Sequence, residues 1–180
     1  EQVTSTLFAA ALKKFGLKSR SWLSWQIPIV TEGFHSNSRI VSIETTKLSK
    51  VLEEGQIPVV PGFQGVSKDF RLSTLGRGGS DASAVALAKC LAADYCEIYT
   101  DVDGVYTTNP AINSKAKKIE KISYEEMLEM ASLGAKVMQS NSVQQGMMND
   151  VEIHVRSTFS NKEGTSITSD DKISYDKVIT

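Results

Sequence analysis

The chain has little of several residue types that mark common classes of protein. Its 180 residues include two cysteines and two histidines, and 20 basic residues balance 21 acidic ones to a net charge of −1. Cys90 and Cys96 lack CxxC spacing, so we expect buried thiols and neither a disulfide nor a metal site. His35 and His154 have no partner at metal-ligand spacing, which makes both poor catalytic candidates. The balanced charge excludes the basic field typical of proteins that bind nucleic acid or anionic membranes.

Long apolar runs are also missing. None approaches the ~20 residues that a membrane-spanning helix needs, and the chain does not begin with a signal peptide. The hydrophobic fraction of 41% is typical of a globular protein, and 180 residues suffice for one well-buried domain. We therefore expect a soluble, cytoplasmic protein with no membrane partner. The first residue is Glu rather than Met, which suggests a piece of a longer chain.

The sequence lacks the common signatures of nucleotide-binding proteins. A Walker A motif, a GxGxxG fingerprint and the protein-kinase catalytic loop are all missing. Any phosphoryl transfer by this chain must therefore use another architecture.

Helical and strand-like patterns alternate along the chain. Apolar spacing predicts helices over residues 2–15 and 45–54, which end at Gly16 and Gly55. A third helix is expected up to about Ala93, and a fourth begins at a capping box formed by Ser123 and Glu126. Strands are expected over residues 57–60, 96–100 and 151–155. The alternation predicts an α/β domain with a largely parallel sheet, and a Ser/Thr/Asp-rich stretch from about Asn161 is a candidate boundary.

A glycine-rich loop precedes the third helix. Residues 72–81 read Leu-Ser-Thr-Leu-Gly-Arg-Gly-Gly-Ser-Asp, in which Ser80 and Asp81 are expected to cap the helix. Glycines let a backbone approach a ligand closely, and a helix N-terminus favours an anion. Arg77 adds a forked cation suited to a carboxylate or phosphate. The alternative interpretation is a tight turn with a solvated arginine.

A second polar loop follows the strand at residues 96–100. It reads Thr-Asp-Val-Asp-Gly-Val-Tyr-Thr-Thr-Asn-Pro over residues 100–110. Ligands of parallel sheets bind outside the carboxyl ends of strands, so this loop is a candidate nucleotide site. Tyr106 would face a base or ribose, and Thr100 and Asp101 would supply hydrogen bonds. The alternative is an ordinary turn, because Asp-Gly and Asn-Pro both mark turns.

Taken together, several segments resemble the aspartokinases of the amino acid kinase family, in order and at that family's spacing. They are Phe63-Gln64-Gly65, Thr74-Leu75-Gly76-Arg77-Gly78-Gly79-Ser80-Asp81, Thr100-Asp101-Val102-Asp103-Gly104-Val105-Tyr106, Ser123-Tyr124-Glu125-Glu126-Met127, Gly134-Ala135-Lys136-Val137 and Val155-Arg156-Ser157. The resemblance implies a three-layer αβα sandwich with a mainly parallel central sheet. It assigns residues 1–167 to a catalytic domain and residues 168–180 to a linker or tail towards a regulatory domain.

The resemblance also implies a reaction. Aspartokinases use ATP and Mg²⁺ to phosphorylate the side-chain carboxylate of L-aspartate, which yields 4-phospho-L-aspartate in the first step of lysine, threonine and methionine biosynthesis. By resemblance, Mg²⁺ is held mainly by the ATP phosphates, with no protein metal ligand, and the full-length enzyme is a homo-oligomer. The alternatives are a non-catalytic fragment that binds ligands or assembles, and a sibling kinase with another small acidic acceptor, such as acetylglutamate or uridylate.

The same resemblance assigns roles to individual residues. Those expected to bind aspartate are Glu1, Phe63, Arg77, Gly79 and Ser80. Those expected to bind the nucleotide are Thr100, Asp101, Tyr106, Asn109, Pro110, Lys136 and Val137. Lys136 would also be catalytic, because it stabilises charge on the γ-phosphoryl oxygens, and Asp81 would orient the catalytic lysines.

The chain departs from the family pattern at four places. The family's initial Lys-x-Gly-Gly strand and its C-terminal ACT domains are missing. Met138-Gln139-Ser140 stands where the family has Leu-His-Pro, and Asn109-Pro110-Ala111 stands where it often has Asp-Pro-Arg. The last change removes a cation near the phosphates. Because one catalytic lysine belongs to the missing strand, we expect the segment alone to be inactive.

Overall fold

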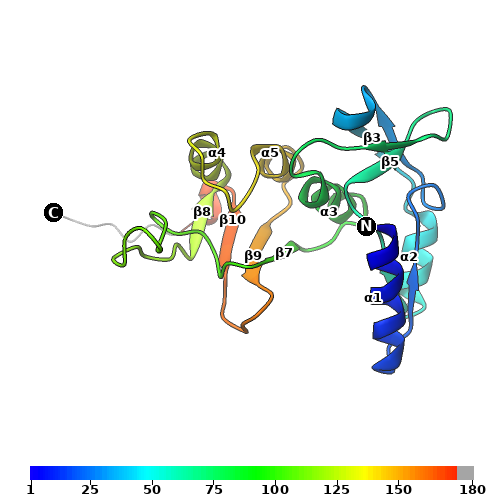
Figure 1. Ribbon diagram of the computed structural model, residues 1–180, viewed down its shortest axis with the longest axis horizontal. Coiled ribbons are helices and arrows are strands. Elements are labelled where there is room, and N and C mark those ends of the chain that lie inside the picture. The colour runs from blue at the N-terminus through cyan, green and yellow to red at the C-terminus, as the bar shows by residue number, and fades with distance from the viewer. Residues whose placement is uncertain (174–180) are drawn as a thin grey trace. The chain divides into compact units, whose positions relative to one another are not determined.

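A computed structural model describes residues 1–173 (Figure 1). The chain divides into two compact units, Glu1–Ala92 and Ala93–Thr180. Within the described residues, no helix has both the length and the apolar character needed to cross a membrane.

The first unit combines three α-helices with two small sheets, coloured blue to green in Figure 1. Its elements are α1 (Gln2–Lys14), β1 (Ser19–Ser21), β2 (Ile29–Glu32), β3 (Arg39–Ile43), α2 (Thr46–Glu53), β4 (Ile57–Val59), β5 (Gln64–Val66), β6 (Leu72–Thr74) and α3 (Gly79–Cys90). A 3-10 turn, His35–Asn37, joins β2 to β3. Strands β1 and β4 pair in parallel, and the other sheet has the order β3-β2-β5-β6 with β2 and β5 parallel.

Helix α1 packs through small residues. Its buried positions are Ser5 and Ala9, one turn apart, and the Ser19 hydroxyl of β1 donates a 2.6 Å hydrogen bond to the Ala9 carbonyl. The large apolar side chains whose spacing predicts this helix are exposed, with Val3 at 73% and Leu7 at 65%. The spacing of the apolar residues thus predicts the helix correctly, but the helix face that contacts the sheet is the one with the small residues Ser5 and Ala9.

The hydrophobic core of the first unit lies between α2 and the loop that follows β1. Its buried members are Trp22, Ile27, Ile29, Leu48 and Val51. Leu48 and Val51 are three residues apart, so they lie on one face of α2 and point into the same core. Helix α3 packs against β3 and β5.

The second unit holds one mixed sheet and two helices. Its elements are β7 (Cys96–Thr100), β8 (Lys121–Ser123), α4 (Tyr124–Ser132), α5 (Ser140–Asn149), β9 (Ile153–Ser157), β10 (Thr165–Thr168) and the 3-10 turn Asp170–Lys172. The strand order is β7-β9-β10-β8, in which only the central pair, β9 and β10, is antiparallel. Helix α4 packs against β8, β10 and α5, as Figure 1 shows. The buried core includes Ile98, Met127, Val143, Ile153, Val155 and Ile167.

The prediction of an α/β fold with mainly parallel strands is confirmed. Among residues 1–173, four of the seven strand pairings are parallel, namely β1/β4, β2/β5, β7/β9 and β8/β10. The three antiparallel pairings are β2/β3, β5/β6 and β9/β10. These strands are distributed over three sheets.

Two predictions are wrong. The polar stretch after Asn161 is not a boundary, because it supplies β10, whose alternate side chains Thr165 and Ile167 are buried between β9 and β8. Cys90 is not buried, because it is the last residue of α3 and lies at the exposed end of that helix. The proposed boundary between residues 167 and 168 stays a prediction, and residues 174–180 of that tail lie outside the described residues.

The capping box at the start of α4 is confirmed and gives a stability prediction. The Ser123 hydroxyl accepts a hydrogen bond from the Glu126 amide at 3.2 Å, and the Glu126 carboxylate accepts one from the Ser123 amide at 3.1 Å. We expect Ser123→Ala to lower the free energy of unfolding by about 1 kcal/mol, because an N-terminal amide of the helix loses its acceptor. Urea denaturation measures the change. The control is Ser132→Ala at the exposed end of the same helix, and an equal loss in both variants would contradict a specific role for the cap.

Candidate functional site

The glycine-rich loop leads from β6 directly into α3. Gly78 has φ +70°, in the left-handed region, and is the N-cap, so the helix begins at Gly79. Ser80 and Asp81 therefore lie inside the first turn, and the prediction that they cap the helix is wrong. The reason is that the left-handed glycine starts the helix two residues earlier than the polar pair would. The prediction that the loop ends on a helix N-terminus is confirmed.

Gly79 approaches its neighbours so closely that no other residue fits there. A Cβ atom at this position would lie 2.6 Å from the Leu75 Cβ and 2.9 Å from Cδ2 of the Phe63 ring. Phe63 itself has φ +67°, an unusual value for a residue with a side chain. The structure therefore brings two predicted aspartate-binding residues, Phe63 and Gly79, into direct proximity.

The N-terminus of α1 joins the same region. Gln2 donates a 2.7 Å hydrogen bond from Nε2 to Oε1 of Gln64, the residue after Phe63. Glu1 precedes α1, is exposed and makes no side-chain capping bond. The first unit thus gathers the segments of Glu1, Phe63 and the first turn of α3.

The charged residues of this region differ in their surroundings. Arg77 is exposed and forms no ion pair or hydrogen bond within residues 1–173, so its guanidinium is available to an anion. Asp81 is partly buried, and burial raises the pKa of its carboxyl above the ordinary value. The first turn of a helix favours a negative charge, so at Asp81 desolvation outweighs that attraction.

The second polar loop follows β7 and is anchored on β10. Gly104 has φ +142°, and a Cβ there would lie 2.6 Å from Oγ1 of Thr165. The same hydroxyl accepts a 2.8 Å hydrogen bond from the amide of Val105, which is buried, and donates one to the Ile119 carbonyl. Thr165 was not among the predicted site residues, because it sits in a polar stretch that resembles a tail. Its three contacts fix the loop that presents Tyr106.

The predicted nucleotide-binding side chains of this loop form local hydrogen bonds. Thr100 donates from Oγ1 to Oδ1 of Asp101 at 3.1 Å, and the Tyr106 hydroxyl donates to Oδ1 of Asp103 at 2.9 Å. Because the phenol gives its hydrogen to a carboxylate, the pKa of Tyr106 is raised and the ring stays neutral near pH 7. The loop therefore presents a neutral aromatic side chain next to the Asp103 carboxylate.

The remaining predicted residues lie in exposed loops of the second unit. The Asn109 side chain accepts a 2.9 Å hydrogen bond from the Ala111 amide, which closes a local turn around the exposed Pro110. Lys136 and Val137 lie between α4 and α5, just after Gly134 with φ +106°. Lys136 is exposed and has no partner in the described part of the chain. Its ammonium is thus a second uncommitted cation.

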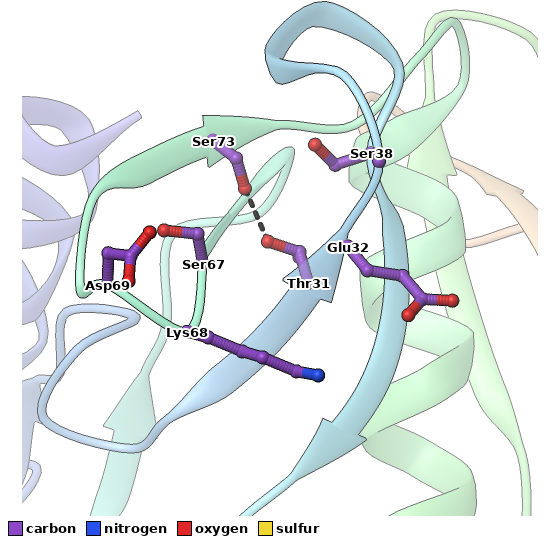
Figure 2. A pocket seen from close by; sticks show the side chains of 8 residues that line it. Thr31, Glu32, Ser38, Ser67, Lys68, Asp69 and Ser73 are labelled. Atoms are coloured by element: carbon purple, nitrogen blue, oxygen red, sulfur yellow. Dashed lines mark hydrogen bonds between the residues drawn. The ribbon is translucent and has the colours of Figure 1, made fainter.

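A separate pocket of about 250 Å³ lies beside β2 and the β5–β6 turn (Figure 2). Its lining residues are Thr31, Glu32, Gly33, Ser38, Ser67, Lys68, Asp69 and Ser73. None of them is a predicted site residue. The buried hydroxyls bond within the chain, as the 2.5 Å contact between Thr31 and Ser73 in Figure 2 shows. The pocket is therefore distinct from the region around Arg77.

Potential metal ligands do not converge in the part of the chain that the structure describes. No group of three or more His, Cys, Asp or Glu side chains there could hold an ion. His154 stacks on Tyr95 with ring centroids 4.6 Å apart, and its Nε2 lies 2.7 Å from Glu152 Oε1. His35 Nδ1 lies 3.2 Å from the Leu72 carbonyl oxygen. Both histidines thus have structural partners.

Comparison with known proteins gives consistent matches along the chain. An aspartokinase of Rickettsia bellii is 45% identical over 99% of this chain, and an aspartate kinase of Pseudomonas putida is 48% identical over 99%. The structure of aspartokinase III of E. coli in complex with aspartate and ADP superposes with a TM-score of 0.83 at 30% identity, and it covers 92% of this chain and 38% of that one. The chain spans 44% of the length of the two curated relatives.

A family-level comparison covers most of the sequence as well. The sequence model of the amino acid kinase family matches residues 1–157, which include both polar loops and Lys136. The predicted resemblance is therefore confirmed, and this chain belongs to the amino acid kinase family.

Proposed function

We propose that this chain is the main part of a catalytic domain that transfers the γ-phosphoryl group of ATP to the side-chain carboxylate of L-aspartate. The observation that carries the proposal is the exposed guanidinium of Arg77, which has no partner among residues 1–173 and lies beside the N-terminus of α3. The names of the relatives support it, as does the aspartate bound with ADP in the E. coli structure. The product is 4-phospho-L-aspartate, the first step towards lysine, threonine and methionine.

The first unit supplies the groups that a small zwitterion needs. Arg77 binds the α-carboxylate in a bidentate manner, and Glu1 pairs with the α-ammonium. The Ser80 hydroxyl orients the acceptor carboxylate at the positive end of α3, next to Gly79, whose own amide donates a 3.0 Å hydrogen bond to the Gly76 carbonyl. The Phe63 ring forms the apolar wall. A carboxylate acceptor has no proton to lose, so Asp81 orients the lysines and does not act as a base.

The second unit supplies the groups that a nucleotide needs. Tyr106 contacts the base or ribose, Thr100 and Asp101 bind the ribose hydroxyls, and Asn109, Pro110 and Val137 line the remaining surface. An aspartate oxygen attacks the γ-phosphorus, the bond to the β,γ-bridging oxygen breaks, and ADP leaves. Lys136 neutralises charge on the γ-phosphoryl oxygens during this step.

We assign Mg²⁺ to the phosphates of ATP, where it neutralises charge between the β and γ groups. We further propose that the longer protein is a cytoplasmic homo-oligomer with no nucleic-acid partner, and that residues 1–167 are its kinase portion.

Replacing Arg77 tests aspartate recognition. In Arg77→Ala the substrate carboxylate loses its charged partner, a loss of ~2–5 kcal/mol, so we expect aspartate affinity to fall roughly 30-fold or more. Calorimetric titration with L-aspartate measures it, and ATP affinity should stay within about twofold. The matched control is Arg71→Ala, an exposed arginine of the β5–β6 turn. Equal aspartate affinity in the two variants would contradict the assignment of Arg77.

Replacing Tyr106 tests the nucleotide loop. We expect Tyr106→Ala to weaken ATP binding about fivefold or more, because an aromatic contact contributes of order 1 kcal/mol beyond burial. Aspartate affinity should not change. Tyr95→Ala, which removes the tyrosine stacked on His154, is the control. If both variants bind ATP like the unsubstituted chain, Tyr106 has only a packing role.

The reaction itself is tested by trapping the acyl phosphate with hydroxylamine. We expect aspartyl hydroxamate only when the chain is supplied with the N-terminal segment of a relative that carries Lys-x-Gly-Gly, since that strand brings the second lysine. Lys136→Ala should then lower kcat ~10²–10³-fold, because one preorganised cation is lost. Lys50→Ala, on the exposed side of α2, is the control.

Assays with other acceptors distinguish an aspartate kinase from a sibling kinase and from a non-catalytic fragment. Acetylglutamate and uridylate, assayed by ADP release, should give no turnover. Turnover with either in place of aspartate would favour a sibling kinase. The lack of turnover with any acceptor would favour a non-catalytic fragment.

A further inference from the structure

One buried hydroxyl joins two of the segments assigned to aspartate binding. Ser83 lies in the second turn of α3 and is 1% exposed. Its Oγ donates a 2.7 Å hydrogen bond to the Ser80 carbonyl and accepts a 3.2 Å bond from the Phe63 amide. A single side chain thus connects the first turn of the helix to the backbone of Phe63.

The Phe63 backbone depends on such contacts. A non-glycine residue with positive φ costs of order 1–3 kcal/mol and persists only where its surroundings hold it. Here the Phe63 amide donates to Ser83, and the Phe63 carbonyl accepts a 2.9 Å bond from the Leu75 amide. These two bonds fix the peptide groups on both sides of the left-handed residue and so set the direction of the ring.

Gln64 extends this connection to α1. Its side chain is 8% exposed, its Oε1 accepts from Gln2, and its Nε2 donates to the Gly62 carbonyl at 3.5 Å. The Gly62 backbone in turn packs on α3, because a Cβ there would lie 2.9 Å from the Ser83 Oγ and 3.2 Å from the Ser80 Cα. Gln64 therefore joins the helix that follows Glu1 to the turn that precedes Phe63.

We infer that Ser83 and Gln64 are positioning residues for the amino-acid acceptor, an inference that rests on the proposed function. Neither side chain touches the substrate. Ser83 holds Phe63 against the first turn of α3, and Gln64 holds the segment of Glu1 next to Phe63. The two side chains together hold three groups in one arrangement: Glu1, the partner of the α-ammonium; the Phe63 ring; and the first turn of α3, which donates hydrogen bonds to the substrate carboxylate.

The test uses the chain supplied with the N-terminal segment and measures hydroxamate formation. We expect Ser83→Ala to raise the KM for aspartate roughly tenfold, which corresponds to about 1.4 kcal/mol, and to leave the KM for ATP within about twofold. Amide hydrogen exchange at Phe63 should become faster, since that N–H loses its acceptor. Gln2→Ala, at the exposed start of α1, removes the Gln64 bond without disturbing the core and should also raise the aspartate KM alone.

Ser142→Ala is the matched control. Ser142 is equally buried, and its Oγ donates a 2.8 Å bond to the Gln139 carbonyl at the start of α5, so the variant loses the same type of local bond outside the first unit. It should lower stability without raising the aspartate KM. An effect on both KM values alike, or on stability alone, in Ser83→Ala and Gln2→Ala would overturn the inference.

Failure of the proposed function gives a different result. In that case the unsubstituted enzyme forms no aspartyl hydroxamate at all. The exchange measurement still decides the role of Ser83, because unchanged exchange at the Phe63 amide in Ser83→Ala would overturn it without reference to turnover.

Discussion

The close approach of Gly79 to Phe63 is the constraint on which the first unit's site depends. A Cβ at Gly79 would lie 2.9 Å from the Phe63 ring, so only glycine permits this contact. The preceding left-handed Gly78 starts α3 there, and helix geometry leaves the Ser80 and Asp81 amides without intrahelical acceptors, whereas the Gly79 amide donates to the Gly76 carbonyl. Backbone donors, an apolar ring and the neighbouring Arg77 are thereby presented together. The glycines of the loop before α3 are therefore needed for close packing as well as for ligand binding.

The two cations that the proposed function assigns to the substrates belong to different units. Arg77 in the first unit and Lys136 in the second are both exposed, and neither is engaged by another side chain of residues 1–173. Other basic side chains, such as those of Arg71 and Lys50, are exposed as well, whereas Arg156 pairs with Glu97 at 2.7 Å. Cations without internal partners are available to carboxylate and phosphate groups, and the proposed function assigns Arg77 to the acceptor and Lys136 to the nucleotide.

The strongly patterned elements were predictable. Helices α1 and α2 have regular apolar spacing and terminal glycines, and the Ser123 capping box is a local signal that needs no tertiary context. Short strands such as β1, β5 and β8 contain three residues each, too few to show a period. Helix α5 contains Ser, Asn and Gly, which have modest or poor helix propensity, and β10 has the composition of a tail. These elements form because tertiary packing outweighs their local preferences.

The candidate site shows the same division. Arg77, the glycines and Tyr106 were identifiable from residue type and resemblance. Thr165 and Ser83 were not, because they contact segments 60 and 20 positions away, and the segment that contains Gln64 does not show that its side chain bonds to Gln2, 62 positions away. A buried serine in an alanine-rich helix has no distinguishing pattern in sequence. Its role becomes visible only when the partner backbone is in place.

The most direct test of the central claim is an NMR titration of the isotope-labelled chain with L-aspartate. We predict that the amide resonances of Gly79 and Ser80 and the Nε–H resonance of Arg77 shift together with one dissociation constant. ATP should instead shift the resonances of residues 100–110. Aspartate-induced shifts confined to residues 100–110, or no saturable shift at Arg77, would contradict the claim that the start of α3 is the amino-acid site.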